Sequence, residues 1–245
     1  MKKIAAITLS SLALSMVFWA CSGQLNQPEK GSTYRVEAML TRDLSTDSAR
    51  IFVTLTKNDV AYKGADVTID SILLDTNAAG YFKKLGATRF PTGSTHTLNI
   101  QDVDTLDANL ALRLPGSFVI DAPTYRQFTG SPVPVQWLPS TGAAGFILAT
   151  VPPVADTSVH PYSAYVTITQ GSIPPETFLY NVNSRIVGTH LIYVAAFTGA
   201  PIADSHLPFE IPATNGYADN VSLSKVTGRV AGMVVAEPDS IHVVD

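Results

Sequence analysis

Short segments in which apolar and polar residues alternate are the feature that most limits how this chain can fold. They recur at residues 34–40 (YRVEAML), 49–58 (ARIFVTLTKN), 65–70 (ADVTID), 90–101 (FPTGSTHTLNIQ) and 108–115 (ANLALRLP). Successive side chains of a β-strand point to opposite faces, so alternation places the apolar residues on one face. Turn-forming residues separate the segments, which predicts short antiparallel strands joined by tight turns.

The composition supports the same fold class. Only 15% of the residues are charged, and 16 prolines and 16 glycines punctuate the chain. Val, Thr, Ile and aromatic residues, which suit pleated strands, are frequent. No stretch sustains the 3.6-residue period of an amphipathic helix, and no heptads occur. We therefore expect an all-β protein.

The second half of the chain continues the strand pattern. Val133, Val135 and Trp137 alternate, and a Pro-Ser-Thr-Gly turn then leads to Phe146 and Leu148. This spacing predicts that Trp137 is buried between two sheets. Residues 220–245 are expected to supply one or two final strands, or a tail packed as an edge strand.

The first half contains a loose pattern of turns and strands, formed by GADVTI (64–69), GY (80–81), GSTHTLNI (93–100) and LRLP (112–115). This pattern resembles the immunoglobulin-like or transthyretin-like modules of bacterial surface proteins, over residues 34–116. The resemblance implies a β-sandwich for residues 34–119 and no particular activity.

The second half resembles a fibronectin type III module in three features. These are a tryptophan before a turn, a following strand that begins with Gly145 and Phe146, and the segment GTHLIYVAAFTG (188–199). Leu191 stands where that family has its corner tyrosine. The Pro- and Gly-containing residues 115–132 mark the boundary, so the second sandwich is expected at 125–245. The expected fold is two tandem antiparallel β-sandwich domains.

The first twenty residues have the layout of a secretory signal. Lys2 and Lys3 precede an uncharged apolar run, and the small residue Ala20 ends it. An uncleaved membrane anchor is the alternative, but residues 4–20 are at the short limit of about 17–25 residues for a span and contain several serines.

Cys21 is the only cysteine of the chain and follows this run directly. The layout Ala20-Cys21-Ser22-Gly23 resembles a bacterial lipoprotein signal, with Phe18 and Trp19 in the places usually held by Leu and a small residue. The resemblance implies that Cys21 becomes the first residue and carries acyl chains such as palmitate. A plain cleaved signal and a reactive thiol are the alternatives; a lone cysteine cannot form an internal disulfide.

Residues 21–33 are polar and lack periodicity, so we expect a flexible tether reaching about 20 Å. Ser22 after the cysteine implies, by the same resemblance, the outer membrane, with the periplasmic face favoured over the cell surface. The formal charge is −4, and loss of the leader with Lys2 and Lys3 makes it −6. Nucleic acid is therefore not an expected partner.

Asp102, Asp104 and Asp107 form the strongest local concentration of acidic residues. Carboxylates at such spacing can bind Ca²⁺, but the glycine and the later bidentate acid of a calcium loop are missing. A solvated hairpin tip is the favoured interpretation, and the question of calcium stays open.

No pattern of catalytic or metal-binding residues stands out. The five histidines (His96, His160, His190, His206 and His242) form no H-x-x-H or H-E-x-x-H motif. G-x-S-x-G and the nucleotide-binding glycine motifs are absent as well. His190 is expected at the surface or half-buried. Tyr162, Tyr165 and Tyr180 could stack on sugars, but packing on a sheet is favoured for each. No enzyme activity, no metal and no cofactor are expected.

These observations favour a lipid-anchored envelope protein with a binding or structural role, in which the sandwich loops contact a protein or a glycan. The alternative is a fimbrial or adhesin-type subunit that assembles by strand addition. The sequence identifies no ligand-binding residues, so the ligand is unknown.

Overall fold

The computed structural model describes residues 33–102, 106–121, 126–153, 161–181, 184–212 and 217–245. These residues confirm the all-β prediction, because they contain strands and two short 3₁₀ turns, η1 (Ala87–Arg89) and η2 (Pro175–Phe178), and no α-helix. Within these ranges no helix is long and apolar enough to cross a membrane.

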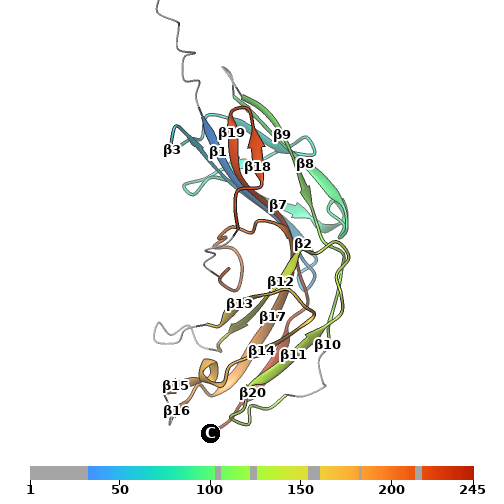
Figure 1. The fold of residues 1–245 in the computed structure, drawn as a ribbon, viewed down its shortest axis with the longest axis vertical. Helices are drawn as coiled ribbons and strands as arrows, with labels where there is room; N and C mark the ends of the chain where they lie inside the picture. Colours follow the sequence, from blue (N-terminus) through green and yellow to red (C-terminus); the bar gives the residue numbers. More distant parts are fainter. Residues whose placement is uncertain (1–32, 103–105, 122–125, 154–160, 182–183, 213–216) are drawn as a thin grey trace, which may run out of the picture. The chain divides into compact units, whose positions relative to one another are not determined.

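One large mixed sheet of 11 strands organises the chain (Figure 1). Its main path runs, in spatial order, through β13 (Ser163–Val166), β12 (Gly145–Val151), β17 (Gly188–Gly199), β19 (Val226–Val235), β1 (Tyr34–Asp43), β2 (Ser48–Lys57), β7 (Tyr81–Gly86) and β6 (Asp75–Thr76). Three further strands pair with this path: β18 (Val221–Leu223) with β19, β20 (Asp239–Val243) with β17, and β3 (Val60–Ala61) with β2.

Three smaller antiparallel sheets accompany it. The four-stranded sheet has the order β5 (Ile72–Leu73), β4 (Asp66–Ile69), β8 (Thr95–Asp102) and β9 (Leu106–Arg113). The three-stranded sheet has the order β10 (Ile120–Asp121), β11 (Val133–Trp137) and β14 (Gln170–Ile173). A short pair consists of β15 (Leu179–Asn181) and β16 (Ser184–Arg185).

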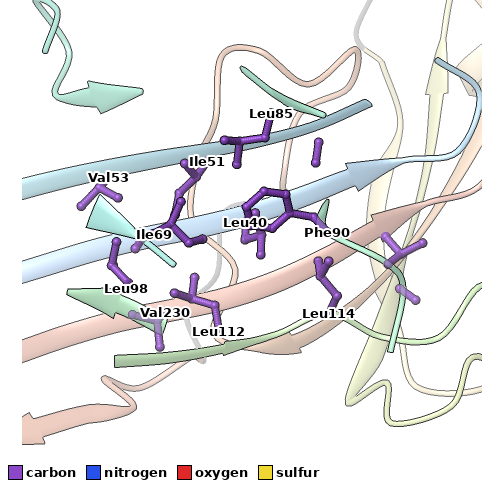
Figure 2. Packing of buried hydrophobic residues seen from close by; sticks show 14 of the residues in the cluster. Leu40, Ile51, Val53, Ile69, Leu85, Phe90, Leu98, Leu112, Leu114 and Val230 are labelled. Atoms are coloured by element: carbon purple, nitrogen blue, oxygen red, sulfur yellow. The ribbon is translucent and has the colours of Figure 1, made fainter. Parts of the chain in front are cut away.

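The alternating segments form strands because their apolar faces pack together. In Figure 2, Leu40, Ile51 and Val53 of the large sheet lie near the side chains of the four-stranded sheet. Ile69, Leu98 and Leu112 supply the facing layer, and all six side chains are almost completely buried. Strand β9 shows the predicted period directly, since its residues alternate between buried and exposed along its whole length.

A second apolar cluster covers the opposite face of the large sheet. Met39 and Phe52 point away from the first core and pack with Ile202, Leu207 and Phe209, which come from the irregular segment at residues 200–212. The middle of the large sheet is therefore covered on both faces. This explains why GFILATV in β12 is a continuous apolar run instead of an alternating one.

Trp137 is buried, as the sequence predicts, and is 3% exposed. Its ring centroid lies 5.4 Å from that of Phe146, so the aromatic pair joins the three-stranded sheet to β12 of the large sheet. Leu191, at the place of the corner tyrosine, lies half-buried in β17.

Residues 220–245 form strands, as expected, but the longest of them is not a tail at an edge. Strand β19 lies in the interior of the large sheet, between β17 and β1. Its two faces are both apolar and both buried, with Val230 and Val234 in one cluster and Met233 and Val235 in the other. A strand with two apolar faces needs cover on both faces, and the middle of the large sheet provides it.

Strand β19 also joins the two expected domains. It pairs with β1 in parallel from Tyr34↔Val226 to Asp43↔Val235. One strand from the expected range 125–245 thus completes the sheet of the range 34–119. The chain forms one large mixed sheet with smaller antiparallel sheets, and independent folding of the two ranges stays a prediction.

Candidate functional site

The structure describes only part of the residues that the sequence singled out. Cys21, the leader and the tether up to residue 32 lie outside the described residues, as do Asp104 and His160. Asp102 ends β8 and Asp107 lies in β9, in the hairpin that these two strands form.

Asp102 is the centre of a compact polar cluster that the sequence did not reveal. Its Oδ2 accepts hydrogen bonds from the Tyr34 hydroxyl at 2.6 Å and from Lys57 Nζ at 2.9 Å. Its Oδ1 accepts one from the Tyr62 hydroxyl at 2.8 Å. We call these four residues the Asp102 cluster. They bring together the start of β1, the end of β2 and the end of β8.

The burial of Asp102 corrects the interpretation of a solvated hairpin tip for this residue. Its side chain is only 3% exposed, because Tyr34, Lys57 and Tyr62 surround the carboxylate. Asp107 does lie exposed in β9, and its Oδ1 is 3.4 Å from Asn99 Nδ2. The two carboxylates therefore have different environments although they belong to one hairpin.

The Asp102 cluster stabilises the ionised forms of its charged members. Hydrogen bonds from the Tyr34 hydroxyl, then from Lys57 and Tyr62, hold the pKa of Asp102 well below its usual range. The Tyr34 hydroxyl and the Asp102 carboxylate raise the pKa of Lys57. The bond to Asp102 also raises the pKa of Tyr62. Lys57 Nζ lies 4.9 Å from the Tyr62 ring centroid, which adds a cation–π contact.

This electrostatic arrangement limits the chemistry of the cluster. Condensation of Lys57 with Asp102 to an amide would need a neutral amine and a protonated carboxyl, and the cluster favours the opposite forms. Both carboxylate oxygens already accept hydrogen bonds, and Lys57 neutralises their charge. Asp102 is therefore a poor ligand for a cation unless Lys57 moves away.

A shallow hollow of about 390 Å³ adjoins the cluster and is lined by Gly64, Asp66, Gln101, Asp102, Leu106 and Asp107. Among the described residues, no group of three His, Cys, Asp or Glu side chains is placed to hold a metal ion. Asp104, the third member of the candidate calcium set, lies outside those residues.

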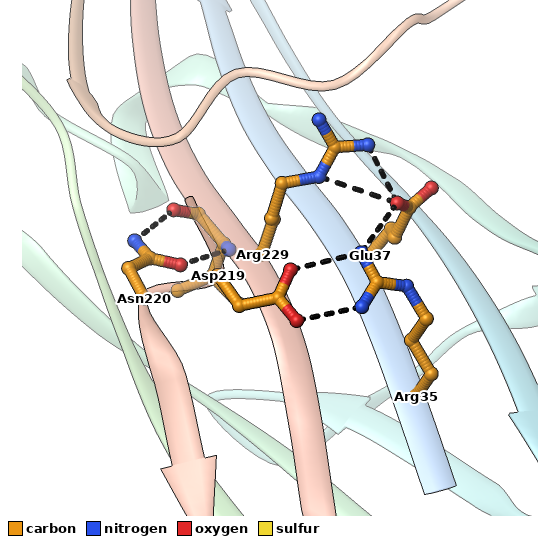
Figure 3. Close-up of polar contacts among 6 residues, drawn as sticks. Arg35, Glu37, Asp219, Asn220 and Arg229 are labelled. Atoms are coloured by element: carbon orange, nitrogen blue, oxygen red, sulfur yellow. Dashed lines mark hydrogen bonds and ion pairs between the residues drawn. The ribbon is translucent and has the colours of Figure 1, made fainter. Parts of the chain in front are cut away.

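A second polar cluster lies across β1 and β19 (Figure 3). Arg35 of β1 forms a bidentate pair with Asp219 at 2.7 and 2.8 Å. Glu37 of β1 accepts a hydrogen bond from Arg229 of β19 at 2.6 Å. We call these four residues the β1–β19 charge ladder. Because its members are partly exposed, their ion pairs contribute little to stability. We infer that they help to fix the register of β1 against β19 and keep this face of the sheet soluble.

A serine, a histidine and an aspartate meet at the start of β8 in a geometry known from hydrolases. His96 Nδ1 lies 2.6 Å from Asp70 Oδ2, and its Nε2 lies 2.5 Å from Ser94 Oγ. No sequence motif signals this group, because Asp70 is 26 positions from His96. In a catalytic triad, such contacts activate the serine hydroxyl.

The backbone around Ser94 favours a structural role for this group. The Ser94 hydroxyl also donates to the Pro91 carbonyl, and the amides of Gly93 and Ser94 donate to the carbonyls of Pro115 and Pro91. These two amides are therefore not available to stabilise an oxyanion. Asp70 Oδ1 accepts a further hydrogen bond from the Thr97 amide. The group thus fastens the β4–β5 turn to β8.

A hollow of about 640 Å³ lies beside the segment that covers the large sheet, and Leu207 and Phe209 contribute to its lining. Its volume is typical of small-ligand sites. Asp204 also lines it, but the Oδ2 of Asp204 is inaccessible to solvent and makes no hydrogen bond. Asp204 Oδ1 lies 2.9 Å from His206 Nδ1, and His206 stacks on Phe82. A ligand could reach Oδ2 only if this segment moved.

The remaining candidates from the sequence are mostly packed side chains. Tyr165 packs against Phe197 and Tyr217, and Tyr162 is half-buried, whereas Tyr180 is 43% exposed. His190 is buried, which corrects the expectation of a surface or half-buried side chain. Its Nε2 donates to the Ile186 carbonyl, and burial lowers its pKa.

Comparison with family models and with curated proteins found no match for this chain. The assignment of a function therefore depends on its own residues and their arrangement.

Proposed function

We propose that this protein is a lipid-anchored component of a bacterial envelope with a structural or binding role. The observation that carries the proposal is the sequence of the N-terminus, where a positive start and an apolar run lead to the only cysteine, Cys21. Acyl chains at Cys21 hold the chain to a membrane, since each buried CH₂ contributes about 0.8 kcal/mol. The outer membrane, on its periplasmic face, is the proposed location.

The folded residues fit a scaffold role. Tyr34 begins β1 directly after the proposed tether, and its hydroxyl donates a hydrogen bond to Asp102, so β1 is fixed at its first residue. We also propose that the large sheet forms two sandwiches with the small sheets. The four-stranded sheet would complete an immunoglobulin-like sandwich, and the three-stranded sheet would complete a fibronectin-like one. The contacts of Leu98 with the first core and of Trp137 with Phe146 support this arrangement.

Contact with a protein or a glycan is the proposed binding role. Tyr180 in β15 is exposed and can stack on a sugar ring. The alternative, a fimbrial or adhesin-type subunit, requires a strand that can be donated to a neighbour. β1 is paired on both edges, with β2 and with β19, so residues 34–43 are not free to act as that strand.

Metabolic labelling tests the anchor. Cells that express the full chain receive an alkyne-tagged palmitate analogue, and the purified protein is coupled to a fluorophore. We expect the wild type to be labelled and Cys21→Ala to be unlabelled, because the thiol is the proposed acceptor. A Ser22→Ala variant is the matched control and should retain the label. Equal labelling of the wild type and Cys21→Ala would refute the anchor.

A further inference from the structure

The first and last long strands of the large sheet are immediate neighbours and run in the same direction. β1 and β19 pair in parallel along their whole length, from Tyr34↔Val226 to Asp43↔Val235 (Figure 1). The N-terminal ends of both strands therefore lie at one end of this ladder. The C-terminal end of β19 lies at the other.

The chain leaves β19 along the same direction. β19 pairs with the second half of β17, from Ala195↔Val235 to Gly199↔Ala231. β20 pairs with the first half of β17, up to Gly188↔Val243, and the Ala236 amide donates to the Val194 carbonyl between the two ladders. Since both strands are antiparallel to β17, the C-terminal end of β20 lies on the far side of the ladder from Tyr34.

This topology fixes how tension between the two ends acts. A pull on the N-terminal end of β1 and on the C-terminal end of β20 moves β1 and β19 in opposite directions along their axes. The hydrogen bonds of a ladder lie across the strands, so this motion strains many of them together. A pull that separates the two strands from the same end would instead break the bonds one after another.

Other contacts resist the withdrawal of β1. On its second edge β1 pairs with β2 over the full strand, from Tyr34↔Lys57 to Asp43↔Ser48. At its first residue the Tyr34 hydroxyl is bonded to Asp102 of β8, which belongs to another sheet. Across the ladder, Glu37 pairs with Arg229. Extraction of β1 must break all of these contacts.

We propose that the β1–β19 ladder is a shear clamp, which resists tension applied between the N-terminal anchor and the end of β20. The inference rests on the proposed function only for the source of the tension. The mechanical strength itself follows from the strand order.

Single-molecule force spectroscopy tests the clamp on the full chain in two pulling geometries. Both use a Cys21→Ser background and a handle on a peptide tag inserted directly after residue 21, so that the handle is retained when the leader is removed. In the first geometry the second handle is a C-terminal tag, so the ladder is sheared. In the second it is attached to Ser224→Cys, in the exposed β18–β19 turn next to Val226, so the same ladder is opened from one end. Thermal melts establish that Ser224→Cys folds like its parent.

We expect the mean unfolding force at equal pulling speed to be at least about twofold higher in the shear geometry, because forced unfolding follows the barrier along the direction of pulling. Equal forces, or a lower force in the shear geometry, would overturn the proposal. The palmitate experiment at Cys21 is independent of this result, so failure of the clamp and failure of the anchor can be told apart.

Discussion

Replacement of Trp137 by alanine is the sharpest test of how the sheets depend on one another. The indole is 3% exposed, packs on Phe146 and joins the three-stranded sheet to the large sheet. Truncation of such a side chain costs about 3–5 kcal/mol through lost burial and the cavity that remains. For a chain of this size, that change lowers the melting temperature by roughly 6–20 °C.

Trp137→Phe is the matched control. The Nε1 of Trp137 is buried and makes no hydrogen bond, so phenylalanine removes an unpaired donor while it keeps most of the apolar volume. We expect this variant to stay within about 1.5 kcal/mol of the wild type, in the range of volume-conserving replacements. A large loss in both variants would show that phenylalanine cannot fill the space of the indole and would contradict this account.

Hydrogen exchange locates the effect of Trp137→Ala. Because β19 of the C-terminal half pairs with β1, we expect amides of the four-stranded sheet, such as those of β8, to lose protection together with those of β11 and β12. The sequence alone predicts a different outcome, in which residues 34–119 survive as an independent domain. Unchanged protection in β8 beside lost protection in β12 would refute the cooperative account and support the two-domain boundary.

Two further substitutions test the ladder and the polar cluster. At Gly228, where φ is +140°, an added Cβ would lie 1.8 Å from the Val36 carbonyl oxygen. Gly228→Ala should therefore lower the free energy of unfolding, measured with urea, by about 2–4 kcal/mol. Gly86→Ala is the control and should change it little, because nothing lies within 4 Å of a Cβ at that position. The Asp102 cluster lowers the pKa of Asp102, so its contribution to stability is present above the unfolded-state pKa of about 4 and is lost as the pH falls below that value. Asp102→Asn should therefore lower the melting temperature at pH 7 and flatten its fall between about pH 4 and pH 2, while the exposed Asp107→Asn should do neither. A wild-type acid profile in Asp102→Asn, measured by circular dichroism, would contradict the role of the cluster.

The sequence predicts the local features well because their causes are local. Alternation placed Leu98 and Ile100 on the buried face of β8, and the VPVQW pattern placed Trp137 inside. Each of these predictions needs only the period of a strand and the preference of apolar side chains for burial.

The partners of the strands and of the polar side chains could not be predicted in the same way. Tyr34 and Asp102 are 68 positions apart, and neither residue carries a signal for the other. The sequence alone predicts a solvated turn at Asp102, because acidic residues in turns usually are solvated. For β19 a signal did exist, since residues 230–236 (VAGMVVA) form a continuous apolar run, which suits an interior strand covered on both faces.

The parallel ladder also determines when the fold can be completed. Glu37 and Arg229, which pair across it, are separated by 192 positions in the chain. Contacts of such high sequence separation close late and make folding slow. Until residues 226–235 are available, β1 has an open edge beside it, which could pair with another chain. While the chain is being synthesised, β1 is complete long before β19, and during that interval its open edge is exposed to aggregation.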